Sequence, residues 1–448
     1  MDKMTAAGVN DTAIRIFADY HRQLADGSTG LIGEETIDPI GEVERLDSLV
    51  ERPEDSEAFA RTVMVRLNGG LGTSMGLSKA KTLLPVRDGL TFLDIIARQI
   101  LAARRRYGVR LPLVLLHSFN TREDSLAALA RYPDLPVPGL PLDMVQSQEP
   151  KLRADDLMPV DWPANPSLEW CPPGHGDIYP TMLDSGILDQ LVDAGFRYAN
   201  VSNSDNLGAA PSAPLAGWFA RSGAQFAAEI TPRTPMDVKG GHVARRKADG
   251  RLILRETAQT APADMTYFTD PAVHPYASTN NLWFDLLALR DVLTARHGVL
   301  GLPLIRNAKT VDPKDPSSTA VVQVESAMGA AIEVFERATA IVVPRSRFLP
   351  VKTTNELTLL RSDVYDWGDD DVPRATVSPL PVVTLAEPYK KIENFEARLP
   401  YPLSLRAAES LTVAGDWRFG RGVSVRGSVT LGPEGGSVAD ATILEGEA

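Results

Sequence analysis

The sequence predicts an α/β protein with a mostly parallel sheet, followed by a smaller region built of β segments alone. From about residue 60 to about residue 350, apolar strand-like runs alternate with stretches whose apolar residues recur at helical spacing. This alternation is typical of a sheet covered by helices. After about residue 400 the helical spacing disappears, and short β segments separated by glycines follow at near-regular intervals. Such intervals favour a small β-helix or solenoid, with an irregular β-meander as the alternative.

The chain is expected to begin with a helix and an extended segment. In residues 11–26, Phe17, Tyr20 and Leu24 recur at helical spacing and indicate an amphipathic helix. The following residues 28–46 are polar and broken by glycine and proline, so we expect them to lie extended over a larger body.

The α/β region follows. Apolar runs predict strands at residues 62–67, 111–118 and 197–205, and helices at residues 91–108 and 176–195.

The second half of this region contains a hairpin. Residues 240–257 hold two strand-like runs around Ala248-Asp249-Gly250, which predicts a β-hairpin in the sheet or beside it. Residues 319–338 are expected to form a strand and then a helix, and residues 339–353 a strand and then a loop.

The composition narrows the classes of partner. The 448 residues are enough for two or three domains. A net charge of −12 argues against nucleic acid, because non-specific binding to its phosphates needs a basic surface. Cys171 is the one cysteine, so no internal disulfide can form, and the sequence shows neither a signal peptide nor an apolar run of membrane length. We therefore expect a cytoplasmic protein that binds neither nucleic acid nor membrane.

A glycine-rich loop directly after the first predicted strand is the strongest local signal. Residues 68–76, NGGLGTSMG, contain four glycines, and Lys79 and Lys81 follow. A strand, a glycine loop and lysines together indicate a phosphate-binding loop. A P-loop is excluded, because no glycine pair has the required four-residue spacing with lysine next. A dinucleotide fold is disfavoured, since the strand that ends near His117 offers no carboxylate for a ribose.

Nucleotidyl transfer is the third use of such a loop. There, glycine amides surround the phosphates of a nucleoside triphosphate, a lysine neutralises the leaving pyrophosphate, and a carboxylate at another strand end holds Mg²⁺. Asp205 stands at such a strand end, although a single aspartate taken alone is better explained as a turn or cap residue. Further polar or glycine-rich stretches at other strand ends indicate one shared site.

Seven motifs carry a family resemblance. In chain order they are LNGGLGTSMG, PPGHGDIY, VSNSDNLGA, DVKGG, TNNLW, ESAMGAAI and VPRSRFLPVKT. In this order they resemble the eukaryotic type of the UTP–glucose-1-phosphate uridylyltransferase (UDP-glucose pyrophosphorylase) family. The resemblance implies an N-terminal segment at residues 1–55, a Rossmann-like nucleotidyltransferase domain with a mixed central sheet at residues 56–375, and a left-handed β-helix at residues 376–448.

The resemblance also implies an activity. It is the Mg²⁺-dependent, reversible transfer of a uridylyl group from UTP to glucose 1-phosphate, giving UDP-glucose and pyrophosphate. The alternatives are a broader UDP-sugar pyrophosphorylase that also accepts other sugar 1-phosphates, and a sugar-nucleotide sensor without catalysis. The C-terminal β-helix is expected to support a homo-oligomer.

Carried onto this chain, the resemblance implies three groups of residues. The catalytic group is Lys81, Lys352 and Asp205, and Asp205 is also the Mg²⁺ ligand. The nucleotide contacts are Leu67, Asn68, Gly69, Gly70, Gln146, Gly174 and Asn203, among which Gln146 and the backbone of Gly174 read the uracil. The sugar-phosphate contacts are His175, Gly241, Glu256 and Asn280 or Asn281.

Two departures from the family pattern lie close to this set. The family usually shows MGCKGPKS after the loop, whereas this chain has MGLSKAKT, which keeps Lys81 in register and adds Lys79 beside it. The uracil segment usually ends in Tyr-Pro-Arg, and here it reads Glu149-Pro150-Lys151.

Overall fold

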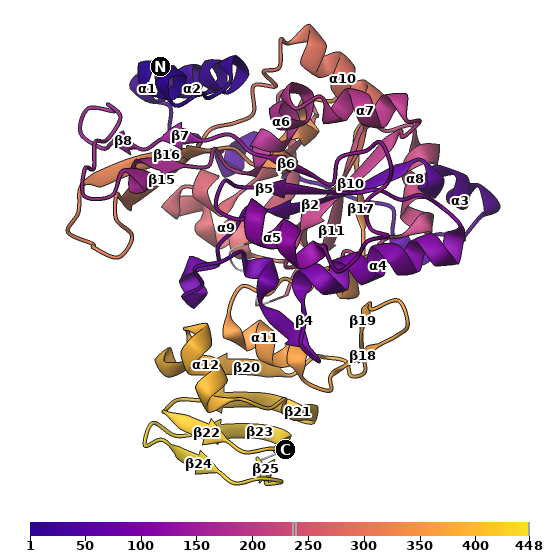
Figure 1. The fold of residues 1–448 in the computed structure, drawn as a ribbon, viewed down its shortest axis with the longest axis vertical. Helices are drawn as coiled ribbons and strands as arrows, with labels where there is room; N and C mark the ends of the chain where they lie inside the picture. The colour runs from indigo at the N-terminus through magenta and orange to yellow at the C-terminus, as the bar shows by residue number, and fades with distance from the viewer. Residues whose placement is uncertain (235–236, 238–239, 447–448) are drawn as a thin grey trace.

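A mixed sheet forms the centre of the molecule (Figure 1). The computed structural model describes residues 1–234, 237 and 240–446, and within this part the sheet has seven strands in the order β17-β11-β14-β10-β2-β5-β6. The strands are β2 (Thr62–Asn68), β5 (Leu113–His117), β6 (Asp143–Val145), β10 (Tyr198–Asn203), β11 (Phe226–Pro232), β14 (Tyr276–Asp285) and β17 (Ala338–Val342). β14 runs against both of its neighbours, and the other neighbouring pairs are parallel. The predicted mixed, mostly parallel sheet is confirmed.

Helices cover both faces of this sheet because its strands turn apolar side chains to both sides. On β2, Met64 belongs to one apolar core, and Val63 and Val65 belong to a second core on the opposite face. The first core includes helices α3 (Pro53–Ala60), α4 (Phe92–Tyr107) and α8 (Ala213–Ser222). The second includes α6 (Ile178–Asp184), α7 (Ile187–Asp193) and α10 (Leu286–Ala295), which Figure 1 shows above the sheet, with α4 below it.

The helix that follows the glycine loop shows how local sequence sets these boundaries. Thr91 and Asp94 form a capping box at the start of α4, in which the Asp94 carboxylate accepts the Thr91 backbone N–H at 2.8 Å. Gly108 ends the helix with a φ of 65°, a conformation that costs glycine little. The loop is thereby held between a buried strand and a well-capped helix.

Two predicted helices differ from the structure. Residues 176–195 form α6 and α7 instead of one helix, because Gly186 adopts a φ of 73° between them. After β16 (Ala320–Glu325), the expected α-helix is a 3₁₀ segment, Met328–Glu333. Its first residue is held by two side chains, since the Met328 carbonyl accepts from Tyr179 and its N–H donates to His175.

The N-terminal elements and the hairpin lie beside the central sheet. The predicted first helix is α2 (Asp11–Ala25), preceded by the short α1 (Asp2–Ala6). The extended segment after it contributes β1 (Ile37–Pro39), which pairs with the hairpin of β12 (His242–Arg246) and β13 (Leu252–Arg255) in a separate three-stranded sheet. The hairpin prediction is therefore confirmed.

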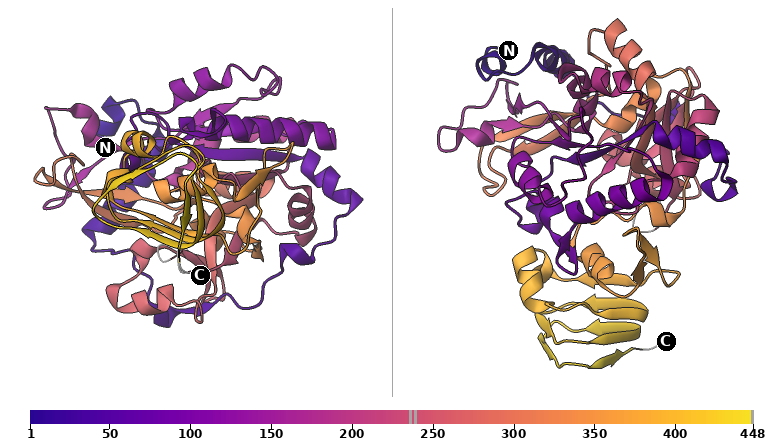
Figure 2. Two further views of the ribbon diagram at one scale, coloured as in Figure 1. Left: turned by 90° about the horizontal axis from the view of Figure 1, so that it is seen from below. Right: turned by 45° about the vertical axis from the view of Figure 1, so that its right-hand side comes forward.

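The C-terminal region is a stack of short parallel strands below the main body (Figures 1 and 2). One sheet has the order β20 (Val382–Leu385), β21 (Ser404–Val413), β23 (Ser424–Leu431) and β25 (Ile443–Glu445), and a second pairs β22 (Trp417–Phe419) with β24 (Gly436–Val438). All of these pairs are parallel. A meander is excluded, because its consecutive strands are antiparallel. The apolar core of this stack continues into the first core of the central sheet through α11 (Thr354–Arg361).

Within the described residues, none of the helices combines the length and the apolar character that a membrane span requires.

Candidate functional site

The side chain of Asn68, the last residue of β2, fixes the start of the glycine loop. Asn68 is buried, and its side-chain oxygen accepts a 2.5 Å hydrogen bond from Thr82 while its nitrogen donates to Ser125 at 2.9 Å. The Asn68 nitrogen also lies 3.2 Å from Nδ1 of His117 at the end of β5. Because this side chain is fully engaged within the protein, we expect a ligand to contact Asn68 through its backbone.

The glycines bring the loop close to its neighbours. A Cβ on Gly69 would lie 3.1 Å from the side-chain nitrogen of Gln146, so the expected nucleotide contacts Gly69 and Gln146 are adjacent. A Cβ on Gly70 would meet nothing within 4 Å, and the Gly70 carbonyl accepts the backbone N–H of Lys81 at 3.0 Å. The loop thus faces open space at Gly70 and places Lys81 directly behind it.

Lys81 joins three segments of the chain. Its Nζ lies 2.6 Å from the Asp205 carboxylate and also donates to the Val351 carbonyl. The backbone N–H of Val351 in turn donates to the Asp205 carbonyl at 3.3 Å. These contacts therefore join Lys81 and Asp205 to the segment that carries Lys352, which follows Val351 directly.

Asp205 fits a metal ligand. Its Oδ1 is buried and has no hydrogen-bond partner, although its Oδ2 pairs with Lys81. Among the described residues, no group of three or more His, Cys, Asp or Glu side chains could hold a metal. Mg²⁺ commonly takes only one or two protein carboxylates and fills its other positions with substrate phosphates and water. The donor set around Asp205 suits that kind of site.

Glu256 lies close to Gly241, one of the two glycines that precede β12. A Cβ on Gly241 would lie 2.6 Å from a Glu256 carboxylate oxygen, so the glycine leaves room for this carboxylate. Burial raises the pKa of Glu256, and the charge of Lys352 opposes this shift. Lys352 itself is exposed. Of the DVKGG motif, residues 238 and 239 lie outside the described residues.

The PPGHGDIY motif forms a tight turn against β16. Gly174 has a φ of 82°, and a Cβ there would lie 2.6 Å from the Ser326 carbonyl oxygen. The His175 Nδ1 accepts the Met328 backbone N–H at 2.8 Å, which leaves the proton of the neutral ring on Nε2. Burial lowers the pKa of His175 to about 4, so the ring is a neutral hydrogen-bond donor at pH 7.

Asn280 and Asn281 have different environments. The Asn280 side chain donates to the Asn203 side-chain oxygen at 3.0 Å, so these two expected contacts are neighbours. The Asn281 side chain is fully buried, and it donates to Glu229 at 3.1 Å and accepts from Asn206 at 3.2 Å. Of the two alternatives, Asn280 is therefore the residue that the structure places beside the rest of the set.

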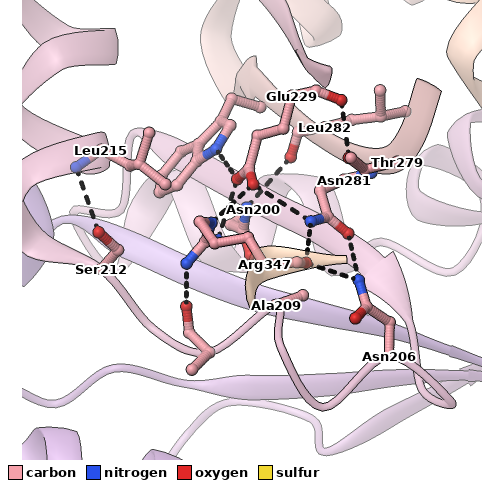
Figure 3. Close-up of polar contacts among 12 residues, drawn as sticks. Asn200, Asn206, Ala209, Ser212, Leu215, Glu229, Thr279, Asn281, Leu282 and Arg347 are labelled. Carbon is pink, nitrogen blue, oxygen red and sulfur yellow. Dashed lines mark hydrogen bonds and ion pairs between the residues drawn. The ribbon is translucent and has the colours of Figure 1, made fainter. Parts of the chain in front are cut away.

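A buried ion pair supports these residues from beneath, and the sequence analysis did not identify it (Figure 3). Glu229 on β11 is bound by the guanidinium of Arg347 at 2.8 and 3.1 Å and by Trp283 at 2.9 Å. The Arg347 carbonyl accepts from the side chains of Asn206 and Asn281 at 3.0 and 3.3 Å. The pair holds the segment that leads to Lys352 against the sheet. A lone carboxylate in the apolar strand FAAEIT was the one signal for it in the sequence.

The structure also places the two departures from the family pattern. Lys79 is exposed, with its Nζ 4.0 Å from the Asp124 carboxylate, and it points away from the partners of Lys81. Lys151 is buried, and its Nζ donates to the Val311 carbonyl at 2.9 Å. Neither lysine lies among the groups that gather around Asp205.

Comparisons with known proteins agree with one another. A family model described as UTP--glucose-1-phosphate uridylyltransferase matches residues 15–426. The UTP--glucose-1-phosphate uridylyltransferase of Hordeum vulgare is 38% identical over 410 residues, which are 89% of this chain and 84% of the barley protein. That of Saccharomyces cerevisiae is 35% identical over 393 residues, which are 87% and 77% of the two chains.

Solved structures show the same similarity over the whole chain. The UDP-glucose pyrophosphorylase from Leishmania major, known in open and closed structures, superposes with a TM-score of 0.93 at 41% identity, covering 99% of this chain and 97% of its own. The UDP-glucose phosphorylase from Trypanosoma brucei gives 0.91 at 40% identity, with 100% and 98% covered. A mutant of the Leishmania enzyme has been solved in complex with UDP-Glc.

Proposed function

Because the chain belongs to the UTP–glucose-1-phosphate uridylyltransferase family, we propose that the residues around Lys81 and Asp205 form its substrate site. The protein transfers a uridylyl group from UTP to glucose 1-phosphate, reversibly, giving UDP-glucose and pyrophosphate. The observation that carries the proposed site is the contact of the Lys81 Nζ with both Asp205 and Val351. This contact joins the glycine loop, the end of β10 and the segment of Lys352.

The proposed binding of UTP follows the position of each group. The backbone of Leu67, Asn68, Gly69 and Gly70 contacts the nucleotide, and Asn203 supports it from the end of β10. Gln146 and the Gly174 backbone contact the uracil. The adjacency of Gly69 and Gln146 supports this arrangement, since one nucleotide can span both.

We propose that the sugar phosphate binds next to His175 and the residues around Glu256. His175 donates to the phosphate from its neutral ring, and Gly241, Glu256 and Asn280 contact the glucose hydroxyls. The closeness of the Glu256 carboxylate to Gly241 supports this arrangement, because both can then contact one sugar.

The chemistry needs no general base. A phosphate oxygen of glucose 1-phosphate, already anionic near neutral pH, attacks the α-phosphorus of UTP. A new oxygen–phosphorus bond forms while the bond to the β-phosphate breaks, and pyrophosphate leaves. The main barrier is the approach of two polyanions, so Lys81 and Lys352 act by positioning them and neutralising their charge.

Asp205 is the proposed ligand of Mg²⁺. The unpartnered, buried Oδ1 supports this role, because a buried carboxylate oxygen without a donor is costly unless a cation completes it. When bound, Mg²⁺ supplies further positive charge to the phosphate oxygens.

Several larger-scale features remain proposals. We place domain boundaries near residues 55 and 375, and the stacked parallel strands support a left-handed β-helix after the second boundary. Exposed apolar side chains on this stack, Val382 and Ile443, support its use in a homo-oligomer. A cytoplasmic location is proposed from the lone cysteine.

The test is pyrophosphate release from UTP and glucose 1-phosphate, with and without Mg²⁺. UDP-glucose should form in equal amount to pyrophosphate, and chelation of Mg²⁺ should abolish turnover. A panel of sugar 1-phosphates measures the sugar range in the same assay. No turnover with glucose 1-phosphate in the presence of Mg²⁺ would contradict the proposal and favour the sensor.

A further inference from the structure

Asp177, the last polar residue of the PPGHGD turn, connects two separate segments of the site. Its carboxylate accepts the Ser147 backbone N–H at 2.6 Å and the Ser147 hydroxyl at 2.9 Å. It also accepts the Thr181 hydroxyl at 2.9 Å, which fixes its orientation on α6. The mechanism above gives this residue no role.

The two segments are those proposed to contact the base. Gln146 precedes Ser147, and its own backbone N–H donates to the His117 carbonyl at 2.8 Å in the sheet. The peptide units on both sides of Gln146 are therefore held, one by β5 and the other by Asp177. The Asp177 backbone N–H lies 3.4 Å from the Gly174 carbonyl, so the same residue closes the turn that presents Gly174.

We propose that Asp177 is a positioning residue for base recognition: its carboxylate holds the Gln146-Ser147 segment at a fixed distance from the Gly174 turn. This proposal rests on the roles proposed for Gln146 and Gly174. The geometry requires that loss of the carboxylate loosens Gln146 relative to Gly174, while Lys81 keeps its contacts with Asp205 and Val351.

The described groups around Asp177 offer no opposite charge with which its ionised carboxylate could stabilise the fold. The side chain is buried, and burial raises its pKa to about 6 in spite of the hydrogen bonds from Ser147 and Thr181. The charged and titratable groups that interact with it are acids or a tyrosine, namely Glu149 on β7, Asp184 on α6 and Tyr20 on α2. No cation among the described residues pairs with this carboxylate. A carboxylate at a position where burial disfavours its ionised form indicates a functional role.

The pH dependence has a defined sign. Above pH 6 the ionised carboxylate accepts the Ser147 N–H strongly, and below pH 6 protonation weakens that bond. The KM for UTP should therefore rise as the pH falls through about 6. Burial is the main reason why this transition lies above the usual range of an aspartate, and the charge of Asp184 adds to the shift.

The test compares D177N and D177A with wild type in steady-state kinetics and in equilibrium binding of UTP. At pH 7.5, D177N should raise the KM and Kd for UTP about tenfold, while kcat and the KM for glucose 1-phosphate stay within about threefold. D177A should show a larger effect, because asparagine retains one acceptor for the Ser147 N–H. The midpoint of thermal unfolding of D177N should equal or exceed that of wild type, since the buried charge is gone. The inflection of KM for UTP near pH 6 should be lost in D177N, while wild type and variant share the titration of UTP itself.

D184N is the matched control, since Asp184 ends the helix that Asp177 precedes but accepts from Thr12 of α2. It should leave the KM for UTP unchanged. An unchanged KM for UTP in D177N, or equal rises for both substrates together with a lower unfolding midpoint, would overturn the proposal. A failure of the proposed function is distinct, because wild type would then form no UDP-glucose at all.

Discussion

Loss of Arg347 should destabilise the protein strongly, because it leaves a carboxylate buried without its counter-charge. Glu229 is completely buried and receives two hydrogen bonds from Arg347, at 2.8 and 3.1 Å. Removing one partner of such a pair typically costs about 3–5 kcal/mol, whereas a surface pair contributes about 1 kcal/mol or less. We therefore expect R347M to lower the free energy of unfolding by about 3–5 kcal/mol.

The pH dependence of this loss can be derived from Glu229. Burial works to raise the pKa of Glu229, but the charge of Arg347 and the hydrogen bonds from Arg347, Trp283 and Asn281 outweigh it and hold the pKa below its usual range. A depressed carboxylate pKa contributes stability above the unfolded-state pKa, and this stability is lost as the pH falls through the folded-state value. The difference between wild type and R347M should thus be largest near pH 8 and should shrink as the pH falls below about 5.

Urea unfolding followed by tryptophan fluorescence is a suitable assay, because Trp283 donates directly to Glu229. R374M is the matched control, since Arg374 pairs with Asp370 at the surface at 2.6 Å, and it should cost less than about 1 kcal/mol. A cycle with E229Q isolates the coupling of the pair. A loss below about 1 kcal/mol in R347M, or a loss that stays the same as the pH falls from 8 to below about 5, would refute the reasoning.

Three further predictions concern the site itself. K352A or K81A should lower kcat about 100-fold or more, equivalent to about 3 kcal/mol, because each removes a charge directed at the transition state. As the control, K79A should change kcat less than about twofold. Near-normal turnover of K352A in steady-state kinetics would contradict the role given to Lys352. G174A should raise the KM for UTP and lower the thermal midpoint, since a Cβ would lie 2.6 Å from the Ser326 carbonyl, and unchanged values of both would contradict the close approach. The His175 ring should titrate near pH 4 in an NMR titration, so that no step of the pH–rate profile between pH 6 and pH 8 belongs to it, and a midpoint near 6.5 would show that the ring is not buried as described.

The central sheet was predictable because its strands are short apolar runs bounded by turn residues. β2, β5 and β10 could be recognised in this way, and the rule that ligands bind at the carboxyl ends of such strands located Asp205. The break at Gly186 was not foreseen, since one glycine within a helical pattern is often tolerated.

The buried support of the site could not be predicted, because it depends on contacts between distant residues. Glu229 and Arg347 are 118 positions apart, and their pairing exists only when β11 and the segment after β17 are already in place. The sequence likewise could not show which of Asn280 and Asn281 lies beside Asn203. Side chains alternate along a regular strand, but β14 has a register shift opposite Glu229 and Ile230, and Asn280 has a φ of 57°. The irregularity directs Asn280 toward Asn203 and Asn281 into the core.

Opposite charges are already matched in the site before a substrate arrives. Lys81 contacts Asp205, Arg347 contacts Glu229, and Lys352 is close enough to Glu256 to oppose the rise in its pKa. For Lys81 to reach the pyrophosphate as proposed, its Nζ must leave the Asp205 carboxylate and the Val351 carbonyl. That movement costs interactions with the protein, which the phosphates must replace, and it frees Asp205 at the same moment for a divalent cation. By the proposed exchange a chain with a net charge of −12 would bind two polyanions, because Lys81 becomes available when an anion replaces its partners.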